Sequence, residues 1–359
     1  MADEELDGAA ADEKRRRENA ELEAVIQNAR ATSASARSKF LSMHTSQHPH
    51  ELQYAPMQPG TVGPTQGAPQ LSCTFEHLCA LAPTSATPCV YVVDDFLSDA
   101  ECEHLVAFGK RRVKHLTKMR PLLEAMAAGP LLEPGEMIEW RADSVPDAVA
   151  RDVERRIGSL MGAPPHELDG GIKLKQTLFQ RGFDDAYGSP RVTDGAHVDV
   201  NKHEHRWGTC IIYLTSLDEA DGGETCFPLA EDPPAALISD ASLLVSSGCY
   251  HTENAADESQ PLADAATRLL AASERSARGH SGLAVRPRKG RVCVFYTRQP
   301  DAEVDPRSFH FGAAVRTPHK EKWTCQIFKA LPMAARQSAS ERQSFMQKVH
   351  PSSARGVES

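Results

Sequence analysis

The sequence predicts an α+β protein, in which a sandwich or barrel of short strands is flanked by helices and preceded by a disordered N-terminal region. Two helix patterns lie before residue 170, and short apolar segments separated by turns dominate after Ala196. The first 72 residues show no pattern of a folded core. A chain of 359 residues is long enough to bury a large core once folding begins, which we expect near Cys89.

Residues 1–72 are predicted to form a charged helix followed by a flexible linker. Residues 13–30 could be helical, but Leu22, Val25 and Ile26 give only a narrow apolar face, typical of a solvated helix or of a docking segment. Residues 36–72 are rich in Pro, Gly and Gln and have no periodicity, which indicates a linker.

The composition narrows the function class and the compartment. A formal net charge of −9 argues against broad nucleic-acid binding. The nine cysteines include no C-x-x-C pair, so we expect mostly free thiols in a reducing compartment. The N-terminus lacks an apolar signal region, and no run of about 18 apolar residues occurs. These features predict a cytoplasmic or nuclear protein that does not act at a membrane.

Ordered elements are expected from Cys89 onward. "CVYVVDDFLS" is an apolar strand that ends in a turn. Ser98 and Glu101 then form a capping box that begins a helix. A second helix fits residues 145–162, where Val149, Val153 and Ile157 recur at helical spacing, and "GIKLKQTLFQ" predicts a strand.

The second half of the chain predicts further strands, interrupted once. The strands are expected at 209–215, 224–227, 283–286, 291–297 and 322–329. Residues 230–281 interrupt this series and contain a helix pattern at 261–279, so they predict an insertion with its own structure. A surface elaboration is its simplest interpretation, with a lid or a partner surface as alternatives. The tail at 331–359 is polar, and we expect it to be loose.

A metal site is suggested by "AHVDVNKHEHRWGTCIIYL". In a strand, His197 and Asp199 would point to the same face. With His310 from "DPRSFHFGAAV" they would complete a set of two histidines and one carboxylate, which leaves open positions and suits non-haem Fe(II). The alternative is zinc held by His197, His203 and His205, although "NKHEHR" is polar enough to be a loop.

Several segments together resemble the prolyl 4-hydroxylase-like 2-oxoglutarate/Fe(II)-dependent dioxygenase family. They are "CVYVVDDFLSDAECEHLVAFGK", "AHVDV", "RWGTCIIYL", "GGETCFP", "VRPRKGRVCVFY", "DPRSFHFGAAV" and "EKWTCQIF", in the order that the family has them. The resemblance covers residues 89–330 apart from the 230–281 insertion, and the order of the blocks makes it specific. It implies a double-stranded β-helix, or jelly roll, flanked by helices. It also implies Fe(2+) held by His197, Asp199 and His310 as the catalytic centre.

The resemblance further implies residues that bind the cosubstrate, 2-oxoglutarate. A lysine of the final core strand would pair with its distal carboxylate; family spacing points to Lys320, and the family's Lys-Trp pair points to Lys322. We favour Lys322, because it lies within the apolar strand. Arg206 and Thr209 match the family motif and would orient ligands or cosubstrate, unless they form an ordinary cross-strand pair. Tyr213 would be in the core or near the cosubstrate.

The sequence departs from the family in one region. Phe179 stands where the family often has a tyrosine, so one hydroxyl contact to 2-oxoglutarate is in doubt. The stretch between Gly182 and His197 is also longer than usual, and its Tyr187 would pack in the loop or reach the site. Inference about the substrate is weakest here.

The expected function follows from the family. The protein would be an oxidoreductase that uses O2 to hydroxylate a substrate while 2-oxoglutarate becomes succinate and CO2, with L-ascorbate supporting the iron. Retention of Asp199 favours hydroxylation over halogenation. The favoured substrate is a prolyl residue of a protein or peptide, as for procollagen-proline 4-dioxygenases. A small molecule or another side chain, and a non-catalytic metal-binding module, remain the alternatives. The oligomeric state is left open.

Overall fold

The computed structural model describes residues 74–111, 138–141, 147–169, 171–178, 195–200 and 203–355. The helix and linker predicted for residues 1–72 lie outside them, as do Phe179 and Tyr187. Apart from residues 166–168, the described residues belong to one compact unit. The first described helix, α2 (Phe75–Ala80), lies ahead of Cys89, so the fold begins earlier than predicted.

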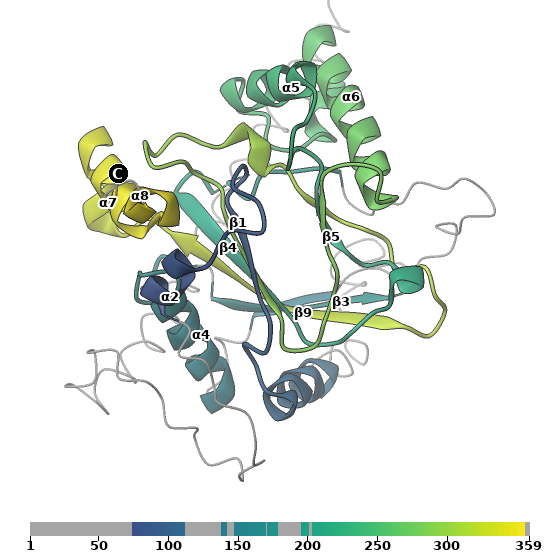
Figure 1. The fold of residues 1–359 in the computed structure, drawn as a ribbon, viewed down its shortest axis with the longest axis vertical. Helices are drawn as coiled ribbons and strands as arrows, with labels where there is room; N and C mark the ends of the chain where they lie inside the picture. The colour runs from purple at the N-terminus through teal and green to yellow at the C-terminus, as the bar shows by residue number, and fades with distance from the viewer. Residues whose placement is uncertain are drawn as a thin grey trace, which may run out of the picture. The chain divides into compact units, whose positions relative to one another are not determined.

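Two antiparallel sheets form the centre of the compact unit (Figure 1). The six-stranded sheet has the order β1 (Val90–Val93), β7 (Val292–Tyr296), β4 (Arg206–Tyr213), β9 (Glu321–Ala330), β3 (Ile172–Leu178) and β2 (Ile138–Arg141). The three-stranded sheet has the order β6 (Leu283–Val285), β5 (Thr225–Phe227) and β8 (Phe311–Gly312). The listed strand ranges are thus confirmed to within a few residues, and β2 and β8 are strands that the sequence analysis missed.

The two faces of the large sheet have different neighbours, because side chains alternate along each strand. One face packs into a buried apolar cluster with the helices, to which β7 contributes Val292, Val294 and Tyr296. The other face contributes Cys293 and Phe295 to a second cluster. That cluster also contains Phe227 of the small sheet, whose ring lies 5.1 Å from the ring of Phe295. The two sheets therefore face one another across an apolar layer.

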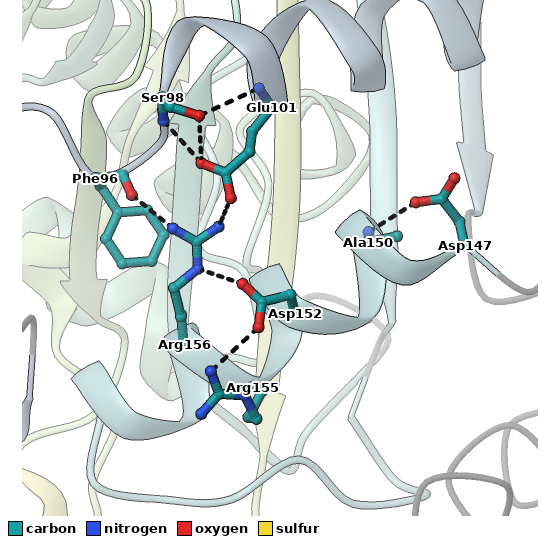
Figure 2. A network of polar contacts seen from close by, with 8 residues as sticks. All are labelled: Phe96, Ser98, Glu101, Asp147, Ala150, Asp152, Arg155 and Arg156. Carbon is teal, nitrogen blue, oxygen red and sulfur yellow. Dashed lines mark hydrogen bonds and ion pairs between the residues drawn. The ribbon is translucent and has the colours of Figure 1, made fainter. Parts of the chain in front are cut away.

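Two helices of the first half of the chain are joined by one arginine. The helix over residues 99–111 begins with the predicted capping box: the Glu101 amide donates to the Ser98 Oγ (3.3 Å), and the Ser98 amide donates to the Glu101 carboxylate (2.8 Å). Arg156 of α4 (Ala148–Leu160) donates to that same carboxylate and pairs with Asp152 (2.9 Å) (Figure 2). This network fixes α4 against the start of the 99–111 helix.

The insertion at 230–281 is helical. It contains α5 (Ala235–Ser246), η4 (Asn254–Asp257) and α6 (Gln260–Ala277), and the last confirms the helix predicted at 261–279. The helices α5 and α6 lie side by side (Figure 1). Two further short 3-10 turns, η3 (Glu219–Asp221) and η5 (Pro306–Ser308), connect strands of the core.

The expectation of a loose tail after residue 331 is wrong. The tail folds into η6 (Met333–Arg336), α7 (Ala339–Val349) and α8 (Pro351–Arg355). Met346 and Val349 are buried in the helix-side core, and the ring of Phe345 lies edge-on to Trp207 at 5.6 Å. The tail has few apolar residues, but α7 places them against the core. Ser338 is the N-cap of α7, and its Oγ accepts from the Glu341 amide (3.2 Å); its S-x-x-E pattern was the sequence signal that could have revealed α7.

The described cysteines bear out the prediction of free thiols. No disulfide joins any of those at positions 79, 89, 102, 210, 226, 249, 293 and 325. Burial raises the pKa of the Cys293 thiol to about 12, so it behaves as a small apolar residue. Across the described residues, no helix combines the length and apolar character needed to cross a membrane.

The tail should make stability depend on pH through His350. This residue is buried against Tyr296, with ring centroids 4.6 Å apart, and burial lowers its pKa from 6.5 to about 4. The unfolded chain therefore binds an extra proton between these values, and the free energy of unfolding should fall as pH drops through that window, by up to about 3 kcal/mol.

Urea unfolding at pH 4 and pH 7 measures this effect. Substituting His350→Phe keeps a flat ring and should reduce the difference between the two pH values. Substituting the exposed His280→Phe is the matched control and should leave the difference unchanged. An equal pH dependence in wild type and His350→Phe would show that the His350 proton does not contribute.

Candidate metal centre

The structure brings His197, Asp199 and His310 together. One ligand atom from each lies within 4.8 Å of the others, and they are the only such group of three found among the described residues. The Nε2 atoms of His197 and His310 lie 3.6 Å and 3.5 Å from the two oxygens of Asp199. Asp199 and His310 are buried, whereas the His197 side chain is partly exposed. The three side chains point at one position that is open on the His197 side.

Main-chain hydrogen bonds set this arrangement. The amide of His197 donates to the carbonyl of His310 and the amide of His310 donates to the carbonyl of His197, both at 2.9 Å. The strand predicted around His197 is reduced to isolated bridges, and Asp199 already lies in a turn. The expectation of a regular strand was therefore wrong, although the two side chains do meet on one side.

The environment of each imidazole fixes which nitrogen is available. His197 Nδ1 lies 3.2 Å from the Gly195 carbonyl, and His310 Nδ1 lies 3.0 Å from the Ser308 carbonyl. A carbonyl oxygen can only accept, so each Nδ1 carries the proton and donates it. In a neutral imidazole this tautomer places the lone pair on Nε2, the nitrogen that faces Asp199, and it is the form that a metal ligand requires.

Arg206 and Thr209 both reach Asp199. The Thr209 hydroxyl donates to Asp199 Oδ2 (2.6 Å), and the Arg206 guanidinium donates to the Asp199 main-chain carbonyl (3.0 Å). Residues three apart in a regular strand point to opposite faces. Here β4 shifts register against β9 between Arg206 and Gly208, and this irregularity lets both side chains reach the same turn.

The charges at the centre are set by the same contacts. Burial, with the nearby His310, lowers the pKa of His197 to about 4, so its imidazole is neutral at pH 7. Burial alone would raise the pKa of Asp199, but the two imidazoles, Arg206 and the Thr209 hydroxyl hold it below its ordinary value. The centre therefore presents a neutral imidazole beside an ionised carboxylate, a set of donors suited to a divalent cation.

The zinc alternative would add His203 and His205 to His197, but these two histidines are not part of this cluster. His203 is exposed, and His205 lies 3.2 Å from the carboxylate of its neighbour Glu204. Within the part of the chain that the structure describes, neither belongs to a group of three potential metal ligands. The geometry favours the set of two histidines and one carboxylate.

The two candidate lysines occupy different environments. Lys322 is buried, and its Nζ lies 5.7 Å from the centroid of the Tyr213 ring on the inner side of the large sheet. Lys320 lies in a turn, has a side chain that is 45% exposed, and pairs with Asp221 at 3.1 Å. Tyr213 is fully buried and donates its hydroxyl to Thr225 (2.8 Å). Lys322 and Tyr213 therefore share the space between the sheets.

One polar residue of this space was missed from the sequence. Thr324 follows Lys322 by two positions on β9, so both side chains lie on the same face. Its hydroxyl is buried and has no hydrogen-bond partner among the described residues. The alternation of side chains along β9 could have revealed Thr324. Its neighbours Trp323 and Cys325 pack in the helix-side cluster, so Thr324 lies on the opposite face of the sheet.

The Thr209 contact predicts a loss of metal affinity. Thr209→Val keeps the shape of the side chain but removes the hydrogen bond that orients the Asp199 carboxylate. We expect Mn(II) affinity, measured by anaerobic equilibrium dialysis, to fall about 10- to 100-fold. The control is Thr267→Val on α6, whose exposed hydroxyl donates to the Ala263 carbonyl of the same helix and which should bind as wild type does. Equal affinities for Thr209→Val and wild type would exclude the orienting role.

The sequence comparisons identify relatives of one kind. No family model matches the chain. A probable prolyl 4-hydroxylase 4 of Arabidopsis thaliana is 27% identical over 263 residues, which are 70% of this chain and 71% of that protein. Prolyl 4-hydroxylase 2 of the same plant is 24% identical over 245 residues, 67% of this chain and 66% of that protein. The chain thus spans about two thirds of the length of these relatives.

Solved structures were also compared. The viral collagen prolyl hydroxylase of Paramecium Bursaria Chlorella virus-1, in its 2OG complex, shares 15% identity over 68% of this chain and 96% of that chain, with a TM-score of 0.35. A prolyl-4-hydroxylase of Pseudomonas putida shares 11% identity over 73% of this chain and 99% of that chain, with a TM-score of 0.36. The chain superimposes only partly on these structures, as the low TM-scores show, so the comparison with known proteins depends on the sequence relatives. The sequence relatives confirm the resemblance seen in the motifs, and over about two thirds of its length the chain is similar to prolyl 4-hydroxylases at 24–27% identity.

Proposed function

We propose that this protein is a 2-oxoglutarate- and Fe(II)-dependent dioxygenase that hydroxylates a prolyl residue of a protein or peptide with O2 and releases succinate and CO2. The observation that carries the proposal is the convergence of two imidazoles and one carboxylate, His197, His310 and Asp199, on a single position. The names of the sequence relatives support the choice of reaction.

The donor set suits Fe(II). Two neutral nitrogens and one carboxylate on one side of an ion leave three positions for other groups, as in non-haem iron oxygenases. Iron held there would supply the activation of O2. In this proposal the protein's part is to select, through the Gly195 and Ser308 carbonyls, the tautomer in which Nε2 is the metal-binding nitrogen, and to keep Asp199 ionised through Thr209 and Arg206.

The space between the sheets suits a dicarboxylate. Lys322 would pair with the distal carboxylate of 2-oxoglutarate, and the unpartnered hydroxyl of Thr324 on the same face would donate a second hydrogen bond. Phe227 and Phe295 pack their rings against His310, at 5.7 Å and 4.5 Å, and would exclude water from that side. The two facing antiparallel sheets support the finer assignment of a jelly-roll core.

The remaining parts of the proposal concern the substrate and the setting. L-ascorbate would keep the iron reduced, as it does for the family. No disulfide forms among the described cysteines, which is consistent with a reducing compartment, so we place the protein in the cytoplasm or nucleus. The substrate assignment depends on the relatives' names alone, which is why its test includes other substrate classes.

The two lysines give the first test. Lys322→Met should raise the KM for 2-oxoglutarate by about 10- to 100-fold, because a charge-assisted hydrogen bond to a buried carboxylate is lost. Lys320→Met removes the same charge two residues away but breaks only the pair with Asp221, so it should leave the KM within about twofold. The measurement is succinate formation against 2-oxoglutarate concentration. A large effect of Lys320→Met with none from Lys322→Met would reverse the assignment.

The second test addresses the reaction itself. Anaerobically purified protein is given Fe(II), ascorbate and 2-oxoglutarate, and succinate is measured after O2 is admitted, with and without proline-rich peptides. We expect succinate in wild type, at least about 100-fold less in Asp199→Ala, and an unchanged yield in the exposed control Asp264→Ala. Mass spectrometry should find one added oxygen atom on a proline of the peptide.

Other outcomes separate the alternatives. Succinate that depends on Asp199 but is not stimulated by any peptide would favour a small molecule or another side chain as substrate. Iron binding without succinate under any condition would favour the non-catalytic metal-binding module. Failure to bind iron would contradict the proposed centre.

A further inference from the structure

The insertion at 230–281 contacts the candidate metal centre through its main chain. Residues 250–252, between α5 and η4, run antiparallel to the segment that carries His197. The Val198 amide donates to the Tyr250 carbonyl (2.9 Å), and the Thr252 amide donates to the Ala196 carbonyl (3.0 Å). The His197 segment is therefore bonded on one side to His310 and on the other to the insertion.

The outer face of the same segment packs against the insertion helices. Ala196, Val198 and Val200 alternate with His197 and Asp199, so they point away from the candidate ligands. All three are buried in one apolar cluster with α5 and α6, which contribute Leu237, Ala241, Leu244, Ala265 and Leu269. A short segment that lies mostly in turns is thus held by apolar burial on its outer face.

Side chains of the insertion complete the contact. The ring of His251 stacks on that of His197, with centroids 5.5 Å apart and planes 12° apart. The Gly195 amide donates to the Glu253 carboxylate (3.1 Å). A Cβ atom at Gly195 would lie 2.6 Å from the Thr252 hydroxyl and 2.9 Å from the Glu253 Cγ, so only glycine permits this approach.

We propose that the insertion is a structural support of the metal centre and that His251 is a positioning residue for His197. The inference depends on the metal site of the proposed function and adds that the insertion, rather than the core sheets alone, sets its geometry. The His197 segment is held by main-chain hydrogen bonds along both of its edges and by apolar packing on its outer face. The insertion supplies the hydrogen bonds of one edge and the apolar packing. A substitution that weakens the contact between the insertion and this segment should displace the His197 Nε2 from the position that a metal requires, although His197 itself is unchanged.

Metal affinity and spectrum test this role independently of turnover. Apoprotein is titrated with Co(II) alone, and its visible absorption is followed while thermal unfolding of the apo form is recorded. His251→Ala and Gly195→Ala should each lower Co(II) affinity by about tenfold or more and change the absorption spectrum of the bound ion. The control is His280→Ala, which removes an exposed histidine of the same insertion and should match wild type. His251→Phe keeps a flat ring beside His197 and should recover most of the affinity.

The outcomes are distinct. Co(II) affinity and spectra equal to wild type in both His251→Ala and Gly195→Ala would overturn the inference, even if the apo variants unfold at lower temperature. If His251→Ala and His251→Phe lower the Co(II) affinity equally, the proposed role of the ring is overturned. If Gly195→Ala does not fold, His251→Ala and His251→Phe still decide the matter. If wild type itself binds no Co(II), the metal site of the proposed function fails, and the inference fails with it.

Discussion

The reciprocal pair of main-chain hydrogen bonds between His197 and His310 is the constraint on which the rest of the site depends. It ties two segments that are distant in the sequence at the point where both imidazoles leave the backbone. With that register fixed, Asp199 can lie between the two Nε2 atoms, and Thr209 of β4 can reach its carboxylate. A shift of one residue in either segment would turn a histidine to the opposite face.

The burial of these polar groups makes their charges interdependent. Asp199 is buried, and a buried carboxylate is unstable unless hydrogen bonds and positive charge compensate for lost water. Thr209 and Arg206 supply part of that compensation. The low pKa of His197 means that this imidazole adds no charge at neutral pH. A divalent cation would complete the compensation, so metal binding and folding should stabilise one another.

The sequence predicted the features that depend on local pattern. The strand and helix ranges follow from periodicity and capping, as at Ser98, and the three candidate ligands follow from a motif whose members lie on short, recognisable segments. What it did not predict depends on tertiary packing. The register shift that lets both Arg206 and Thr209 reach Asp199 arises from pairing with β9. The residues "RWGTCIIYL" contain no pattern that predicts it. The helix α7 was missed, although Ser338 offers an N-cap in the sequence, because its few apolar residues show a buried face only once they pack against Trp207.

The insertion shows most clearly why a sequence pattern can locate a site without explaining its rigidity. The segment around His197 is too short and too irregular to hold two ligand side chains by its own hydrogen bonds, since its described part contains only a single bridged residue. Its order must come from its neighbours. On the inner side, Phe227 and Phe295 pack against His310, and on the outer side the insertion helices bury Val198. Precise placement of a ligand needs such support in every direction, because a displacement of about 1 Å is enough to spoil a site. The loop sequence supplies the donor atoms, and the two layers around it determine where those atoms lie.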